Sequence, residues 1–294
     1  MYKRQVPQGA VYLHTSHLRL DRPELFTWLD RRQDVQSVFF VHDIIPIEHP
    51  EYGVPGEAER HRIRMRTVAT RAAAVVVSSQ SVRNTLESYL TDEKLRVPPI
   101  QVAAIGVEPA FTAGTGPATA SARPYFVVCS TIEARKNHLL LLQIWREIAA
   151  TLGPATPALV VVGRRGWESE NVIDLLERCP AMRDHVIEAP GLSTPGLVHL
   201  LRGARALLMP SFAEGYGIPV VEALSLGTPV IASDLPVHRE ISGGHAQLYP
   251  PLDGLGWRDA ILAAANAAPQ VRSGFQPPRW SDHFNAVDAL VAGL

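Results

Sequence analysis

Two glutamates stand eight residues apart in the stretch PSFAEGYGIPVVEALSLGTPVIASD, residues 210–234. Glu214 precedes a Gly-Tyr-Gly turn, and Glu222 follows Pro219, a residue type that suits the first turn of a helix, which would then end at Gly227. Carboxylates hydrogen-bond vicinal hydroxyls well, and the free N–H groups at a helix N-terminus can hold a phosphate. The stretch therefore predicts a pocket for a ligand that carries both a polyol and a phosphate, such as a sugar nucleotide.

Each glutamate also has a purely local explanation. Glu222, placed in the first turn or so of a short helix, would complement the helix dipole, an effect worth about 0.3–1 kcal/mol. Glu214 could be an ordinary turn residue. Glu214 has the weaker local explanation of the two, because it lies in the loop before the helix and at the end of an apolar run.

Further polar residues follow apolar runs elsewhere in the chain. Arg135 and Lys136 in STIEARKNH come just before a long apolar helix, where cations gain nothing from the helix dipole. Their position favours an anionic ligand, although two solvated surface charges would give the same pattern. His42, in the stretch FFVHDIIPIEHPEY, could accept or relay a proton, although a single histidine is more often structural.

Ten apolar runs of strand length could position these residues. They span 10–16, 37–43, 73–79, 100–106, 125–130, 158–163, 185–191, 204–211, 229–234 and 246–251. Continuous apolar runs are typical of strands buried on both faces, as in parallel sheets. Segments such as 137–153 and 168–179 read as helices between them. The alternation predicts an α/β protein, and ligands of such open sheets bind beyond the carboxyl ends of the strands.

A stretch rich in Gly, Ala, Thr and Pro at 112–124 predicts a linker between two domains, at 1–117 and 118–294. The chain has 294 residues, of which 46% are hydrophobic and 19% charged, with a formal net charge of −1. This balance argues against a general nucleic-acid binder. The two cysteines form no framework, and no apolar run has the roughly 20 residues of a membrane span, so we expect a cytoplasmic protein.

The stretch SFAEGYGIPVVEALSLGTPVIASD resembles the E-x7-E motif of the retaining GT-B glycosyltransferases of family 4. TIEARKNHLLLL, VVVGRRGW and HDIIPIEHPEY are similar to the bacterial polysaccharide enzymes of that family, which are often mannosyltransferase-like. The resemblance covers nearly all of residues 10–294. It implies two Rossmann-like doubly wound domains, with donor binding in the C-terminal one. It also implies transfer of a hexose, with mannose expected, from a nucleotide-diphosphate sugar to a saccharide or lipid-linked saccharide acceptor, without a metal or other cofactor.

The resemblance also implies residue roles. Glu214 would contact the hydroxyls of the transferred sugar, Glu222 the nucleotide ribose, and Lys136 with Arg135 the leaving diphosphate. His42 would line the catalytic cleft from the acceptor-side domain. The remaining expected donor contacts are backbone amides or nucleobase neighbours, namely Gly163, Leu192, Gly215, Tyr216, Gly217 and Ile218.

The chain departs from this family at two places. Thr131 stands where many relatives carry an arginine, and the first strand of the family with its Gly-rich loop is not found. Residues 1–5, MYKRQ, match one frame of a common transposase sequencing adaptor. We therefore expect an incomplete N-terminal domain and an adaptor remnant at residues 1–5.

Other interpretations stay open. The chain could be a catalytically inactive fragment or a nucleotide-sugar-binding module, or an epimerase of the same architecture. Arginines at 60, 62, 64 and 66 would split between two helix faces, which favours a solvated helix over a weak contact with the inner face of a membrane. Several histidines show no metal-ligand spacing and are expected to be structural or on the surface, at 49, 61, 138, 185 and 238.

Overall fold

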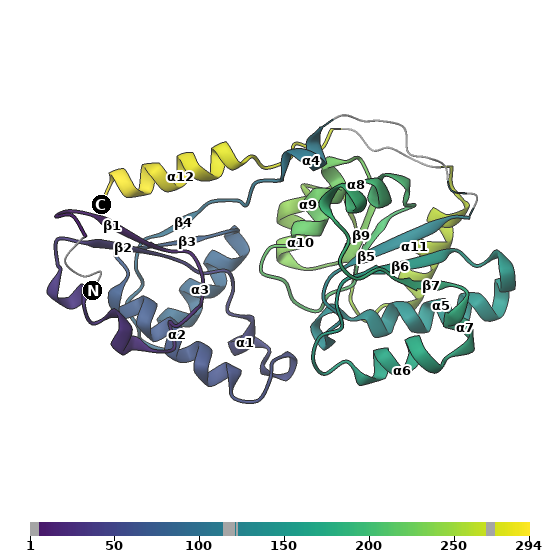
Figure 1. The fold of residues 1–294 in the computed structure, drawn as a ribbon, viewed down its shortest axis with the longest axis horizontal. Coiled ribbons are helices and arrows are strands. Elements are labelled where there is room, and N and C mark those ends of the chain that lie inside the picture. Colours follow the sequence, from purple (N-terminus) through teal and green to yellow (C-terminus); the bar gives the residue numbers. More distant parts are fainter. Residues whose placement is uncertain (1–5, 114–120, 122, 269–273) are drawn as a thin grey trace. The chain divides into compact units, whose positions relative to one another are not determined.

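The computed structural model describes residues 6–113, 121, 123–268 and 274–294 (Figure 1). The expected adaptor remnant at residues 1–5 lies outside the described residues, as does most of the expected linker at 112–124. The chain forms two compact units. The first comprises Met1–Gly106, Glu214–Tyr216 and Pro278–Leu294, and the second comprises Val107–Ala213 and Gly217–Pro277.

The first unit is built on a parallel sheet of four strands, which lie in chain order. They are β1 (Val11–His14), β2 (Gln36–Phe40), β3 (Ala74–Val77) and β4 (Ile100–Val102). All four residues of β3 are buried, which explains its uninterrupted apolar sequence. Each strand was expected from its apolar run.

Helices cover both faces of this sheet. Alternate strand residues point to opposite faces, so Phe39, Val75 and Val77 pack with α2 (Glu57–Arg71) and α3 (Gln80–Asp92). Their neighbours Val38, Ala74 and Val76 pack against α12 (Trp280–Ala292). The short elements of this unit are η2 (Pro23–Phe26), η3 (Leu29–Arg31), α1 (Ile45–Glu48) and η4 (Pro50–Tyr52).

The C-terminal helix was expected in the second domain, at 118–294. The structure places it in the first unit. The reason is packing: the apolar face of α12 covers the sheet with Ala286, Val287, Leu290 and Val291. His283 adds a hydrogen bond between its Nδ1 and the carbonyl oxygen of Ala103 at 3.1 Å. At Gly106 there is no room for a side chain, because a Cβ atom would lie 2.3 Å from the backbone nitrogen of Trp280.

The second unit contains a parallel sheet of six strands in the order β10-β9-β8-β5-β6-β7. The strands are β5 (Tyr125–Cys129), β6 (Ala158–Val162), β7 (Val186–Glu188), β8 (Leu207–Met209), β9 (Val230–Ser233) and β10 (Gln247–Tyr249). This is the doubly wound Rossmann order, in which the chain reverses direction along the sheet between β5 and β8. The expected α/β class and the Rossmann-like character are confirmed.

The helices of this unit enclose a core that contains the buried rings of Trp145 and Trp257. The N–H groups of both indole rings are hydrogen-bonded: Trp145 donates to the carbonyl of Pro157 at 2.9 Å, and Trp257 donates to that of Pro250 at 3.1 Å. The helices are α4 (Pro109–Thr112), η5 (Ala134–Lys136), α5 (His138–Leu152), η6 (Gly153–Ala155), α6 (Glu170–Arg178), α7 (Pro180–Arg183), α8 (Thr194–Gly203), α9 (Ile218–Ser225), α10 (Pro236–Ser242) and α11 (Gly254–Asn266).

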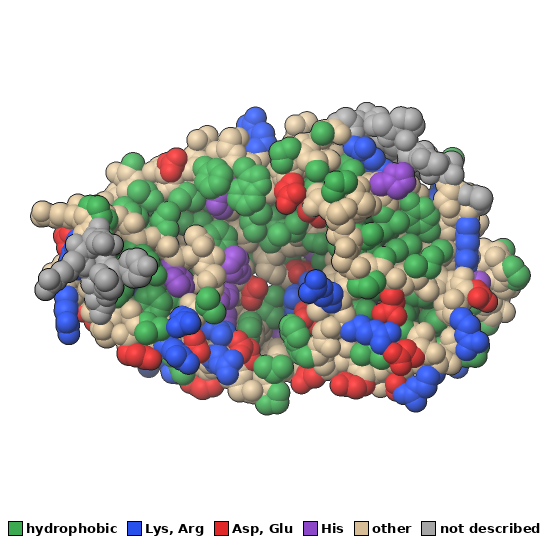
Figure 2. All heavy atoms as spheres, in the orientation of Figure 1, with side chains coloured by type: hydrophobic (Ala, Val, Ile, Leu, Met, Phe, Trp, Pro, Cys, Tyr) green, Lys and Arg blue, Asp and Glu red, His purple; other side chains and the backbone are tan. Residues whose placement is uncertain are grey.

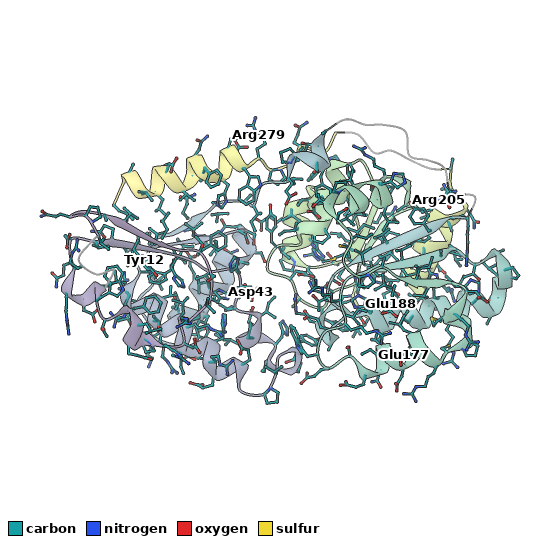
Figure 3. All side chains as sticks on the ribbon, in the orientation of Figure 1. Tyr12, Asp43, Glu177, Glu188, Arg205 and Arg279 are labelled. Atoms are coloured by element: carbon teal, nitrogen blue, oxygen red, sulfur yellow. The ribbon has the colours of Figure 1, made fainter. Side chains whose placement is uncertain are left out.

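Charged side chains of both signs are interspersed over the surface (Figure 2). On α2 the arginines divide as expected, with Arg60 and Arg64 pairing with Glu57, and Arg62 and Arg66 pairing with Glu59. On the second unit Arg165 pairs with both Glu177 and Glu188 (Figure 3). Among the helices that the structure describes, none has the length and apolar character needed to span a membrane.

Candidate functional site

The point where the strand order reverses brings two loops together in the second unit. One follows β5 and contains Arg135 and Lys136, and the other follows β8 and leads into α9. The backbone N–H of Phe212 donates to the carbonyl of Arg135 at 2.9 Å, so the two loops are hydrogen-bonded directly. Doubly wound sheets bind ligands in the crevice beyond the carboxyl ends of the strands, at the point where the strand order reverses. Both sequence motifs follow strands that meet at this point.

Asn137 connects three strand ends at this crevice. Its φ of 53° is left-handed, and its side-chain amide donates to the carbonyl of Pro210 at 3.1 Å and to that of Pro251 at 3.0 Å. These carbonyls follow β8 and β10. Sequence reasoning missed this residue, although asparagine before an apolar helix is a residue type that tolerates a left-handed backbone. Asn137 therefore holds the start of α5 in place.

Arg135 lies at the crevice in a structural role. Its guanidinium donates to the carbonyl of Ala213 at 2.7 Å and to the carboxylate of Glu133 at 2.8 Å. Glu133 is 4% exposed, so the pair is largely removed from water. Arg135 thus ties the loop after β5 to the loop after β8, and its charge is partly compensated by Glu133.

Lys136 and Glu222 both act on the thiol of Cys129, at the end of β5. Burial raises the pKa of this thiol to about 11, and Glu222 raises it further while Lys136 lowers it. The ammonium and the carboxylate therefore both lie in the neighbourhood of Cys129. Two of the expected site residues thus lie near the end of β5.

Glu222 is half-buried in α9, and its pKa is raised to about 7, chiefly by burial and further by the charge of Glu108. Glu108 immediately precedes α4 and was not anticipated from the sequence. The expectation that Glu222 lies in the first turn of the helix was wrong, since α9 begins at Ile218 and has no acidic residue in its first turn. Compensation of the helix dipole is therefore a poor explanation for this buried carboxyl group.

The start of α9 needs a glycine. Gly217 has a φ of 99°, and a Cβ atom there would lie 3.1 Å from Ile241 and 3.4 Å from the ring of His238. His238 is fully buried, and its Nδ1 lies 2.8 Å from the carbonyl oxygen of Ser233. The helix ends at Ser225, and Gly227 follows its C-cap with a φ of 75° and a hydrogen bond from its N–H to the carbonyl of Leu224 at 3.0 Å.

The loop after β6 packs against the loop after β5. A Cβ atom on Gly163 would lie 1.9 Å from the carbonyl oxygen of Ser130, so only glycine fits at this position. The two loops also pair through the backbone, where Ile132 donates to the carbonyl of Arg164 at 2.9 Å. Leu192, in the loop before α8, is 42% exposed. Both expected nucleobase neighbours thus follow strands of the same sheet, β6 and β7.

The remaining expected site residues belong to the first unit. His42 follows β2, with its Nε2 at 3.3 Å from the carbonyl oxygen of Thr15. The segment Glu214–Tyr216 is assigned to this unit, where Tyr216 donates to the carbonyl of Ile105 at 3.2 Å. Glu214 is half-buried.

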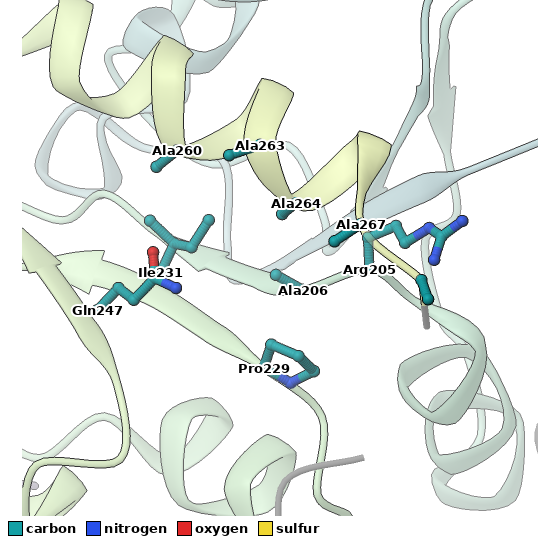
Figure 4. Close-up of a pocket in the computed structure, with 10 residues that line it drawn as sticks. Arg205, Ala206, Pro229, Ile231, Gln247, Ala260, Ala263, Ala264 and Ala267 are labelled. Atoms are coloured by element: carbon teal, nitrogen blue, oxygen red, sulfur yellow. The ribbon is translucent and has the colours of Figure 1, made fainter. Parts of the chain in front are cut away.

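A cavity of about 210 Å³ lies at the opposite edge of the second sheet (Figure 4). Its lining includes Ala206 and Pro229, which precede β8 and β9, and several alanines of α11. These residues are at the amino ends of the strands. The cavity is therefore separate from the crevice at the strand carboxyl ends, and its lining is apolar apart from Arg205 and Gln247.

Residues 117–247 match the family described as Glycosyl transferases group 1. These residues are therefore similar to a glycosyltransferase domain. The matched residues include both loops of the crevice and the whole of α9.

Curated relatives point in the same direction. The chain is 29% identical over 251 residues to the serotype-specific mannosyltransferase WbdA of Escherichia coli, a match that covers 80% of this chain and 30% of WbdA. It is 34% identical over 130 residues to the O-antigen chain mannosyltransferase B of Escherichia coli, covering 44% of this chain and 33% of that protein. The chain thus spans about a third of the length of these curated relatives.

Solved structures show the same fold. The crystal structure of Anabaena HepE in complex with UDP matches 96% of this chain and 74% of its own, with a TM-score of 0.67 and 15% identity. TarM matches 90% of this chain and 50% of its own, with a TM-score of 0.68 and 14% identity. The GT-B glycosyltransferase fold expected from the sequence is confirmed.

Proposed function

We propose that this protein is a retaining glycosyltransferase that moves a hexose from a nucleotide-diphosphate sugar to a saccharide or lipid-linked saccharide acceptor in polysaccharide biosynthesis. The observation that carries the proposal is the reversal of strand order between β5 and β8, with Lys136 in the segment after β5 and Glu222 in α9, the helix after β8. The mannosyltransferases among the relatives favour mannose as the sugar, and the UDP-bound neighbour supports a nucleotide donor.

In this proposal Lys136 stabilises the negative charge that develops on the leaving diphosphate. A positive charge held beside a strand end needs no reorganisation when the bond to the sugar breaks. The backbone amides of Gly217 and Ile218, at the start of α9, add donors to the same phosphates. Arg135 acts mainly by holding the two loops together, through Ala213 and Glu133. These groups would replace a metal ion, so we propose a metal-independent reaction.

Glu222 would bind the ribose hydroxyls of the donor. With a pKa raised to about 7, its carboxyl group is protonated in part near neutral pH and can donate as well as accept hydrogen bonds. Gly163 and Leu192 would flank the nucleobase. Glu214 would bind hydroxyls of the transferred sugar, with Gly215 and Tyr216 offering amides, and His42 would face the acceptor.

Calorimetry with GDP and UDP, followed by a transfer assay with GDP-mannose and a mannose-terminated acceptor, tests the proposal. We expect binding of one nucleoside diphosphate, and Glu222→Ala to weaken it by about tenfold through the loss of a charged hydrogen bond. Glu147→Ala is the matched control, because Glu147 is exposed on α5 and pairs with Arg258. Binding without turnover would favour a nucleotide-sugar-binding module, and no binding would contradict both functions.

A further inference from the structure

Three histidine rings gather at the carboxyl end of the first sheet. His17 lies in the loop after β1, His42 follows β2, and His61 lies on α2. The ring centroid of His17 is 5.2 Å from that of His42 and 4.8 Å from that of His61. Figure 2 shows a group of histidine side chains on this unit. The sequence singled out only His42, because residues that are distant in the chain meet here through the folding of β1, β2 and α2.

The hydrogen bonds determine which nitrogen of each ring carries the proton. The backbone N–H of His42 can only donate, and it points at Nε2 of His17 at 3.2 Å, so this nitrogen must be an acceptor. The carbonyl of Thr15 can only accept, so Nε2 of His42, at 3.3 Å, must carry a proton. Nδ1 of a neutral His42 is then left with its lone pair.

His61 forms a hydrogen bond with the backbone of Asp43, the residue after His42. Its Nε2 donates to the carbonyl of Asp43 at 3.2 Å, and its Nδ1 accepts from the guanidinium of Arg64 at 3.2 Å. Arg64 is in turn paired with Glu57. The side chain of Asp43 (Figure 3) caps the turn that follows by accepting from the N–H of Ile45 at 3.1 Å.

The surroundings of His17 and His61 disfavour the charged form of both rings. The pKa of His17 is lowered to about 3, chiefly by burial and also by the nearby His61, His42 and Arg64. Burial also lowers the pKa of His61, against the opposing charges of Asp43 and Glu57. His17 therefore remains a hydrogen-bond acceptor at any pH at which the protein would work.

We propose that His17 is a positioning residue: by accepting the backbone N–H of His42, it fixes the main chain from which the His42 ring extends, and so leaves Nδ1 of His42 available to an acceptor hydroxyl group. The inference rests on the proposed function, which places His42 on the acceptor side. His17 needs no contact with the substrate for this role. What matters is an acceptor atom at the position of its Nε2, together with a ring that carries no charge.

Two substitutions separate positioning from simple packing. His17→Gln keeps an acceptor oxygen near the position of Nε2, whereas His17→Leu keeps the bulk and removes the acceptor. We expect His17→Leu to lower kcat for turnover of GDP-mannose by about 10- to 100-fold, with the KM for the donor unchanged, and His17→Gln to retain most of the activity. His49→Gln is the control, because His49 belongs to the same unit and pairs with the exposed Glu51. Equal losses in both His17 variants would overturn the proposal.

A spectroscopic measurement on the full chain is independent of turnover. Long-range proton–nitrogen NMR correlations of the imidazole rings should show His17 as the neutral Nδ1–H tautomer at pH 7, and His42 as the Nε2–H tautomer. The amide proton of His42 should exchange faster in His17→Leu than in the wild type or in His17→Gln. A protonated or Nε2–H His17 would refute the positioning role even if transfer is observed. The expected tautomers without any turnover would refute the proposed function, and with it the catalytic purpose of the arrangement.

Discussion

The two parallel sheets of this protein use different means to organise polar groups at their carboxyl ends. In the first sheet the strands lie in chain order, and the loops after β1 and β2 are linked by hydrogen bonds between histidine rings and the backbone. In the second sheet the order reverses between β5 and β8, and the loops there are linked by hydrogen bonds from Asn137 to Pro210 and from Arg135 to Ala213. A reversal opens a crevice that admits charged ligands, whereas adjacent loops in a sequential sheet pack on one another.

As a consequence, the two units differ in the kind of polar groups that they carry at the strand ends. Near the crevice of the second unit, Lys136 and Glu222 are titratable groups whose charges influence Cys129. Around His42 the neighbouring rings of His17 and His61 are held neutral by burial. The first arrangement suits stabilisation of an anion, and the second suits the orientation of a proton acceptor. The following predictions test this contrast, in order of expected effect.

The largest effect is expected from Lys136→Ala. Removing a preorganised charge that acts on a leaving group typically lowers turnover by about 10²–10³-fold, so kcat for GDP-mannose should fall by that amount, with a smaller change in KM. Lys94→Ala is the control, because Lys94 follows α3 in the other unit. An unchanged kcat in Lys136→Ala would remove the charge-stabilising role from the second unit.

Gly163→Ala should lower the free energy of unfolding by about 3 kcal/mol, because the new methyl group would overlap the carbonyl of Ser130 and push the loops after β5 and β6 apart. Urea unfolding followed by circular dichroism measures the change. Gly254→Ala is the matched control, since a Cβ atom there meets only Leu140 at an ordinary 3.7 Å. Equal stability of both variants would show that the loops can separate without cost.

Asn137→Ala removes the two hydrogen bonds to Pro210 and Pro251 and leaves their carbonyls without this partner. We expect a loss of about 2 kcal/mol in unfolding free energy and weaker binding of the nucleoside diphosphate. Asn137→Asp keeps the shape but offers no donor, so it should be at least as destabilised. If Asn137→Asp were as stable as the wild type, the connection between the strand ends would not depend on these hydrogen bonds.

The smallest effect concerns the pH dependence of Glu222. Its pKa is raised from 4.5 to about 7, so between these values the folded state binds more protons than the unfolded state, and stability falls as pH rises through this window. We therefore compare the unfolding free energy of Glu222→Gln with that of the wild type at each pH. The difference should favour the variant by about 1 kcal/mol more at pH 8 than at pH 4, after allowance for solvent screening. Unfolding titrations at both pH values measure it, with Glu147→Gln as the control. A difference that does not vary with pH would mean that Glu222 titrates normally.

Much of the fold could be predicted from the sequence, because strands buried on both faces appear as uninterrupted apolar runs. Each of the ten expected strands is observed, and the helices at 137–153 and 168–179 correspond to α5 and α6. The ends of α9 were also readable, since Gly217 and Gly227 both have backbone conformations that favour glycine. The position of Glu222 in α9 was misjudged by one residue, because Pro219 occupies the second helical position and not the first.

The sequence by itself determined which residue types stand after each strand, and hence that Lys136 and Glu222 would lie at strand ends. Only the tertiary structure decided which strand ends are neighbours, because the order of strands in a sheet depends on pairing between segments far apart in the chain. The same holds for α12, whose apolar face fits the first sheet, and for His17, whose partner lies 25 residues away. Local residue patterns report burial and turns, whereas hydrogen bonds between distant loops exist only once both sheets have formed.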